Sequence, residues 1–223
     1  MTEVALKREI KLERILLHEL IHRINNEFSS LIGAVSRTAA RSVNNEVKIA
    51  LAHVIELLSH YGELHHALQM PENDTLIDAS AYLESLCLAI SRSKLVGTRI
   101  DLVLTASPLR LPSELCWRLG MIVYELVTNA ARHAFGDGNG QIRVELSRAG
   151  KFVECRVVDN GAAPAKVQRG RGLKIVDELV KGLDGRLDQR FGQGGSFSIL
   201  TFPYKGEPQQ AGHQDKTDAE CCR

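Results

Sequence analysis

The sequence predicts an α+β protein in which an N-terminal helical hairpin precedes an α/β sandwich with a mixed sheet under helices. Apolar residues recur every three or four positions up to about residue 68, which is the period of an α-helix. Beyond residue 76, short segments with the alternating polarity of strands lie between further helical patterns. The chain of 223 residues is long enough for two modest domains of these two kinds.

The first part of the chain predicts two long helices joined by an asparagine-rich turn. Residues 4–41 contain no proline and a single glycine, Gly33. The second helix ends before Pro71, and its apolar residues keep a four-three spacing at Ala50, Val54, Leu57, Tyr61, Leu64 and Leu68. A lone hairpin leaves both apolar stripes uncovered, so we expect a homodimer whose two hairpins form a four-helix bundle. We assign residues 1–70 to this dimerisation domain.

After a polar linker at residues 71–74 the pattern changes to a mixture of strands and helices. We predict helices at residues 77–91, 112–135 and 172–182, and strands at residues 99–105, 141–147, 152–158, 186–191 and 196–202. These segments make up a second domain at residues 76–203. The remaining residues, 206–223, are polar without periodicity, which predicts a disordered tail.

Charge and composition predict a cytoplasmic protein that does not bind nucleic acid. Lys and Arg total 28 against 27 Asp and Glu, so the formal net charge of +1 provides no basic field for a phosphate backbone. The chain has neither a signal-peptide pattern nor an uninterrupted apolar run of about 18 residues, so we expect no membrane insertion. The five cysteines form no C-x-x-C pair, which is typical of reduced cytosolic thiols.

Two groups of residues in the second domain predict a site for a phosphate-bearing ligand. Glu125, Asn129 and His133 are spaced four apart and therefore lie in one column on a helix. A predicted strand ends at Asp159, and the segment Gly170-Arg171-Gly172-Leu173 opens the next helix. Glycines just before a helix N-terminus let backbone N–H groups approach phosphate oxygens, and the helix dipole favours their negative charge.

This combination resembles the GHKL-type ATP-binding domain of sensor histidine kinases. Residues 125–130 match its N box, residues 159–161 its first glycine box and residues 170–173 its second. The resemblance implies that ATP and Mg²⁺ bind here, with Asn129 as the metal ligand and Asp159 as the acceptor for the adenine amino group. It places the remaining nucleotide-binding positions at Glu125, Arg132, His133, Gly161, Gly170, Gly172 and Leu173, with Arg132 and His133 reaching the phosphates.

The hairpin carries a second resemblance, because residues 18–26 are similar to the H-R-x-x-N acceptor box of the HWE-like histidine kinases. This resemblance places the phosphoryl acceptor at His22. Glu19 lies three residues before it and can orient its ring, and Asn26 lies one turn after it and can position phosphate. His18 is the alternative acceptor, since it begins a stretch similar to another acceptor box. That box continues with a Pro that this chain lacks, so we favour His22.

The resemblance implies an ATP-dependent autokinase that phosphorylates His22 and passes the phosphoryl group to the receiver aspartate of a response regulator. Three departures from the family pattern leave a second function open: Ala163 in place of a glycine, a short lid at residues 165–169, and Asn25 in place of the usual Lys. In that alternative, a histidine phosphotransferase with a degenerate nucleotide domain shuttles phosphoryl groups without ATP. A non-signalling ATPase is a third class and leaves the acceptor box unexplained. Because 17 residues precede His18, we expect the stimulus to be detected by a separate sensor protein, by the bundle itself or by a region outside this sequence.

Overall fold

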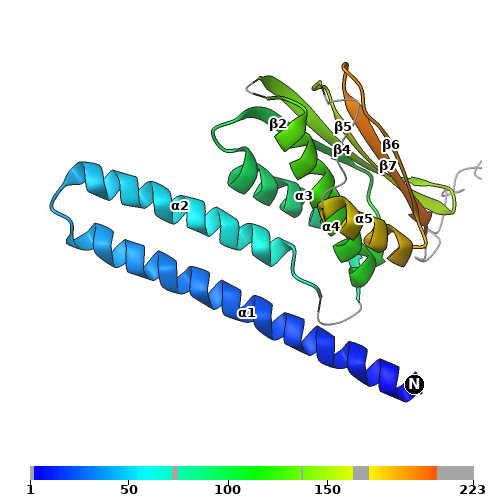
Figure 1. Ribbon diagram of the computed structural model, residues 1–223, viewed down its shortest axis with the longest axis horizontal. Helices are drawn as coiled ribbons and strands as arrows, with labels where there is room; N and C mark the ends of the chain where they lie inside the picture. The colour runs from blue at the N-terminus through cyan, green and yellow to red at the C-terminus, as the bar shows by residue number, and fades with distance from the viewer. Residues whose placement is uncertain (1–2, 72–74, 137, 163–170, 205–223) are drawn as a thin grey trace, which may run out of the picture.

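The computed structural model describes residues 3–71, 75–136, 138–162 and 171–204 (Figure 1). Its first two helices, α1 (Glu3–Arg41) and α2 (Asn45–Ala67), pack side by side as the predicted hairpin. Asn44 begins α2, since its side-chain oxygen accepts hydrogen bonds from the N–H groups of Glu46 and Val47. This N-cap confirms the asparagine-rich turn that the sequence predicts.

A five-stranded mixed sheet forms the centre of the second domain, as predicted. Its strands are β2 (Arg99–Ala106), β4 (Asn139–Ala149), β5 (Phe152–Asp159), β7 (Ser196–Pro203) and β6 (Arg186–Arg190), in that spatial order. β2 runs parallel to β4, and all other neighbouring strands are antiparallel. Residues that alternate along each strand therefore point to opposite faces, and one face carries Ile142, Val144 and Leu146 into the core.

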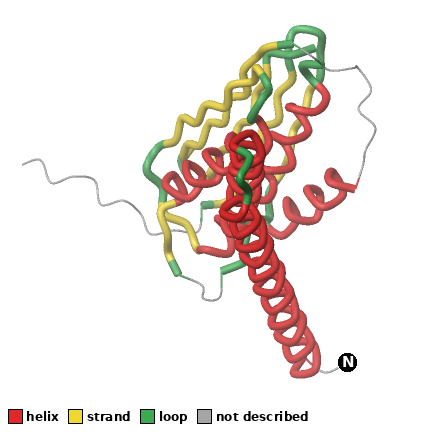
Figure 2. The backbone as a smooth tube through the Cα atoms, turned by 90° about the vertical axis from the view of Figure 1, so that its left-hand side faces the viewer, coloured by secondary structure: helices red, strands yellow, loops and turns green. Residues whose placement is uncertain are grey.

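Three helices cover this inner face: α3 (Ala79–Ile90), α4 (Ser113–His133) and α5 (Arg171–Gly182). Figure 2 shows the strands on one side of the domain and the helices on the other. α4 turns its apolar stripe inward, and Leu119, Ile122 and Val123 are fully buried. The flank next to this stripe carries the polar column of Glu125 and Asn129, so packing of the core fixes the direction in which this column points.

The predicted helix at residues 77–91 begins and ends differently in the structure. Its first residues belong to a short strand, β1 (Leu76–Asp78), which pairs with β3 (Arg110–Pro112). Asp78 then caps α3 by accepting hydrogen bonds from the N–H groups of Ser80 and Ala81. At the other end the chain continues as a π-helix, η1 (Ser91–Leu95). The helical start at residue 77 was wrong because the partner strand lies more than 30 residues away in the sequence.

The end of α2 packs against the second domain. Leu64 is buried in the common core, and the hydroxyl of Tyr82 donates a hydrogen bond to the carbonyl oxygen of Ala67 at 3.2 Å. The indole N–H of Trp117 donates to the carbonyl oxygen of Leu68 at 3.0 Å. These bonds satisfy two of the carbonyl groups that a helix C-terminus leaves unpaired. The apolar stripe of α2 is therefore covered by this chain's own second domain at its C-terminal end.

Several predictions fall on residues outside the described ranges, namely the tail at residues 206–223, Gly170, and the segment from Ala163 through the lid. Within the described ranges, none of the helices combines the length and the apolar character that crossing a bilayer requires.

Candidate nucleotide and phosphoacceptor sites

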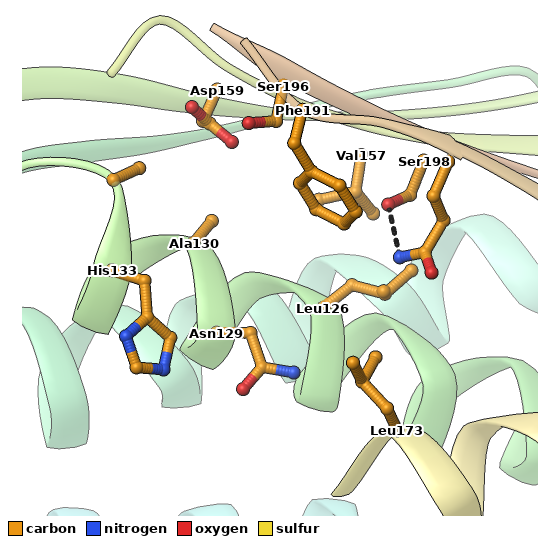
Figure 3. A pocket seen from close by; sticks show the side chains of 12 residues that line it. Leu126, Asn129, Ala130, His133, Val157, Asp159, Leu173, Phe191, Ser196 and Ser198 are labelled. Atoms are coloured by element: carbon orange, nitrogen blue, oxygen red, sulfur yellow. Dashed lines mark hydrogen bonds between the residues drawn. The ribbon is translucent and has the colours of Figure 1, made fainter. Parts of the chain in front are cut away.

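A pocket lies between α4 and the inner face of the sheet (Figure 3). It encloses about 500 Å³ of space, open solvent included. Its helical wall consists of Leu126, Asn129, Ala130, His133 and Ala134, with Leu173 from α5. Its floor consists of side chains from β5, β7, β6 and the residue after β6, namely Val157, Asp159, Ser196, Ser198, Gln189 and Phe191.

Asp159 is the acidic group of the pocket, and only 8% of it is exposed. Its carboxylate accepts a hydrogen bond from the N–H of Gly161 at 3.1 Å. Burial raises the pKa of Asp159 above its ordinary value, and the hydrogen bonds from the N–H groups of Gly161 and Ser196 oppose this rise. The Ser196 hydroxyl also lies beside the carboxylate, and this closeness opposes the rise in the pKa as well (Figure 3).

Gly161 has a packing role next to Asp159. A Cβ atom at this position would collide with the backbone carbonyl of Ala134, at the C-terminal end of α4. The N–H of Ala162 donates to that same carbonyl oxygen at 2.7 Å. The absence of a side chain therefore lets the end of β5 approach the end of α4, which brings Asp159 close to the residues of the helix.

The structure gathers some of the predicted nucleotide-binding residues and leaves others aside. Asn129, His133, Asp159 and Leu173 line the pocket together. Glu125 lies beside Gly172 at the start of α5, where a Cβ on the glycine would meet its carboxylate. Arg132 is exposed on α4 and does not line the pocket. Roles for these residues remain predictions.

The hairpin exposes the predicted acceptor residues on α1. His22, Glu19 and Asn26 are all exposed and lie on successive turns of the same face. Glu19 accepts a hydrogen bond from the Nε of Arg23 at 2.9 Å, so its carboxylate also pairs with the arginine of the acceptor box. Side chains of residues 3–18 lie outside the described part, and the choice between His18 and His22 stays a prediction.

Comparison with known families identifies both parts of the chain. A sequence model of the histidine kinase-like ATPase domain matches residues 96–192, which contain ten of the twelve residues that line the pocket. A sequence model of the histidine kinase family matches residues 19–94, which contain His22. The chain belongs to the histidine kinase family. These matches divide this histidine kinase between residues 94 and 96, and the boundary that we place at residues 70–76 stays a prediction.

The chain spans only part of the length of two curated relatives. The blue-light-activated histidine kinase 2 of Erythrobacter litoralis is 27% identical over 196 residues, which cover 84% of this chain and 56% of the relative. The sensor histidine kinase PdtaS of Mycobacterium tuberculosis is 26% identical over 187 residues, which cover 78% of this chain and 36% of the relative. The chain therefore spans little more than half the length of one relative and about a third of the other.

Solved structures confirm the fold of this histidine kinase. The histidine kinase domain of the E. litoralis EL346 blue-light activated histidine kinase matches with a TM-score of 0.57 and 24% identity, over 78% of this chain and 95% of that chain. The Acinetobacter baumannii histidine kinase AdeS matches with a TM-score of 0.52 and 18% identity, over 85% of this chain and 98% of that chain. Together with the family matches, they confirm the resemblance to sensor histidine kinases with a GHKL-type domain.

The residues of the pocket fit an adenine nucleotide with its magnesium ion. The buried Asp159 carboxylate is an acceptor for an amino group, and the buried Ser196 hydroxyl beside it can serve a further polar atom of the same ring. Across the cavity, the Asn129 side chain supplies an amide oxygen, a ligand type that Mg²⁺ accepts (Figure 3). Among the described residues no group of three or more His, Cys, Asp or Glu side chains forms a metal site, so phosphate and water oxygens would have to complete the coordination.

The sequence interpretation missed four floor residues, namely Gln189, Phe191, Ser196 and Ser198. The feature of the sequence that could have revealed them is the alternation in the last hairpin. There the inward Ser196 and Ser198 alternate with the outward Phe197 and Ile199. Alternation alone does not tell which face of a hairpin points inward, because both faces of β7 carry apolar residues.

Proposed function

We propose that this protein is an ATP-dependent protein-histidine autokinase that phosphorylates its own His22 and passes the phosphoryl group to a receiver aspartate. One observation carries this proposal: α4 and β5 bring Asn129, His133 and Asp159 around one pocket, in a chain whose preceding helix exposes His22. An adenine-binding acid, an oxygen ligand for magnesium and a nucleophilic ring are the parts that phosphoryl transfer to histidine requires.

Each part has a chemical role in the proposed reaction. Asp159 accepts a hydrogen bond from the adenine amino group, and Asn129 holds the magnesium ion, which neutralises charge on the phosphates when it is bound. His133 and Arg132 add donors near the phosphates. A ring nitrogen of His22 attacks the γ-phosphorus, so that a phosphorus–nitrogen bond forms as the bond to the bridging oxygen breaks and ADP leaves.

Glu19 and Asn26 support the acceptor in this proposal. Glu19 accepts a hydrogen bond from the imidazole and thereby orients its second ring nitrogen, in competition with its ion pair to Arg23. Asn26 donates an amide N–H to the transferred group one turn further along α1. The phosphoryl group then moves to an aspartate of a response-regulator receiver domain, and a second copy of the chain completes the bundle that presents His22.

Incubation with γ-³²P-labelled ATP and Mg²⁺ tests the proposal. We expect acid-labile, base-stable label on the wild-type protein, and loss of that label in His22→Ala and in Asn129→Ala. His53→Ala is the matched control, because His53 is an exposed histidine on the neighbouring helix and should keep full labelling. Label that persists in His22→Ala and disappears in His18→Ala would move the acceptor to His18.

Two other results would favour the alternatives. Absence of label from ATP, together with label transferred from a phosphorylated receiver domain to His22, would favour a phosphotransferase that works without ATP. Steady release of inorganic phosphate without any phosphoprotein would favour a non-signalling ATPase.

A further inference from the structure

The nucleotide pocket contains a second polar group on its floor, apart from Asp159. Gln189 on β6 and Ser198 on β7 lie side by side across the sheet, and the Gln189 amide donates a hydrogen bond from Nε2 to the Ser198 Oγ at 3.0 Å (Figure 3). Both residues line the pocket. Neither belongs to the N box or to the glycine boxes.

This pair has hydrogen-bonding capacity that the protein itself does not use. Ser198 is 7% exposed, and its hydroxyl oxygen accepts from Gln189 while the hydroxyl proton has no acceptor recorded among the described residues. The second N–H of the Gln189 amide is likewise available as a donor. Leu126, Val157 and Phe191 form apolar surface around the pair. The Ser198 hydroxyl is a buried donor in these apolar surroundings, which is costly unless a partner accepts from it. It therefore favours a ligand atom that is a hydrogen-bond acceptor, with the half-buried Gln189 amide beside it.

The strand register places this pair at a definite distance from Asp159. Asp159 pairs with Ser196, and Val157 pairs with Ser198, so Ser198 is the next inward residue along β7. Consecutive inward residues of a strand lie roughly 7 Å apart. A planar ring held by its amino group at Asp159 would thus have a different edge directed at Ser198 and Gln189.

We propose that the Ser198 hydroxyl, held by the Gln189 amide, donates a hydrogen bond to a purine ring nitrogen on an edge other than the one that faces Asp159. This inference rests on the proposed function and assigns two specificity-determining residues to it. Adenine has such acceptors at N3 in its six-membered ring and at N7 in its five-membered ring, and a pyrimidine has no five-membered ring and therefore no N7. Asp159 then selects the amino group, and the Ser198–Gln189 pair selects the purine skeleton.

Binding of ATP, 3-deaza-ATP and 7-deaza-ATP to the full chain, measured by calorimetry, tests this inference. In each analogue a C–H replaces one ring nitrogen, so the analogue that lacks the recognised atom should bind the wild-type protein roughly fivefold to tenfold more weakly than ATP. In Ser198→Ala and in Gln189→Leu the ratio of this analogue's Kd to the Kd of ATP should fall toward one, because the hydroxyl donor is absent in the first variant and no longer held in place in the second. The other analogue should behave like ATP in all three proteins.

Asp159→Asn is the control. It weakens the contact with the amino group, but the deaza analogue that lacks the recognised nitrogen should still bind this variant more weakly than ATP does. The inference is wrong if both analogues bind the wild-type protein as tightly as ATP. It is also wrong if the analogue's weaker binding relative to ATP is unchanged in both Ser198→Ala and Gln189→Leu. Should Ser198→Ala fail to fold, Gln189→Leu and the wild-type comparison still decide. A wild-type protein that binds no ATP would contradict the proposed function as well, which is a different result from equal binding of all three nucleotides.

Discussion

At the scale of single residues, Asp159 has both a shifted pKa and a proposed role as the acceptor for the adenine amino group. Burial raises the pKa of this carboxyl group above the ordinary aspartate value of 3.8, and the N–H donors of Gly161 and Ser196 only partly oppose the rise. The folded protein therefore binds a proton at Asp159 more readily than the unfolded chain does. The same position is the one where the proposed function requires a charged acceptor.

This pKa predicts how stability depends on pH. Between the raised pKa and 3.8, the folded state holds more protons at Asp159 than the unfolded state does. The unfolding free energy of the wild type, minus that of Asp159→Asn, should therefore increase as the pH falls through this window, and level off below 3.8. Urea titrations at a series of pH values measure this difference. A difference that decreases on acidification would mean that the fold stabilises the carboxylate.

Two glycines predict opposite effects of the same substitution. Gly161→Ala should destabilise the protein by about 1–3 kcal/mol, because the added methyl group meets the backbone of Ala134, which cannot rotate away. Gly62→Ala, in the interior of α2, has open space around its Cβ position and should stabilise the protein by up to about 1 kcal/mol through helix propensity. Urea denaturation measures both. Equal effects would show that the close approach at Gly161 is relaxed in solution.

At the scale of elements, the joint between α2 and the second domain is a set of specific contacts. Tyr82 and Trp117 donate to the last carbonyl groups of α2, Arg92 lies 3.7 Å from the carboxylate of Glu63, and Lys94 lies 4.5 Å from the ring centre of Tyr61. The first two contacts fix the end of the helix, whereas the last two involve exposed charges and contribute less.

Removal of one hydroxyl tests this joint. Tyr82→Phe should lower the unfolding free energy by about 1 kcal/mol, because the Ala67 carbonyl loses its donor in a partly buried site. It should also speed amide hydrogen exchange in the last turn of α2 more than elsewhere. Tyr61→Phe is the matched control, since no hydrogen bond of the Tyr61 hydroxyl is recorded in the described ranges. Similar losses in both variants would argue against a specific role for the Tyr82 bond.

At the scale of the whole molecule, the hairpin carries apolar side chains that the described residues leave uncovered. Leu20 and Leu31 on α1 are 55% and 53% exposed, and Val47 and Val54 on α2 are 42% and 40% exposed. Within each pair the spacing, of 11 and 7 residues, places both side chains on one face of the helix. The C-terminal half of the α2 stripe is covered by the second domain, so the uncovered part is the half nearer the turn together with α1.

This distribution predicts which substitutions break a dimer. Leu31→Glu and Val54→Glu should shift the protein from dimer to monomer in light scattering at micromolar concentration, because each puts a charge into the proposed bundle. Leu88→Glu is the control, since Leu88 is 50% exposed on α3, away from the hairpin. A wild-type protein that is already monomeric would contradict the predicted homodimer.

Local patterns in the sequence predict much of the fold and some of the residues of the nucleotide pocket. The helical period at Leu119, Ile122 and Leu126 predicts both the helix α4 and the side on which Asn129 lies. Strand alternation likewise predicts the burial of Ile142 and Val144. The pairing of β1 with β3 and the inward direction of Ser196, Ser198 and Gln189 were not predicted, since they depend on partners far along the chain.

By itself, the sequence determined the helices of the hairpin, the strands of the sheet and the column that carries Asn129, because each depends on residues within one or two turns of one another. The tertiary structure alone decided three features: the end of α2 packs on Tyr82 and Trp117, Arg132 lies outside the pocket, and the Ser198–Gln189 pair faces into it. These features need contacts between segments far apart in the chain, and no local period specifies such contacts.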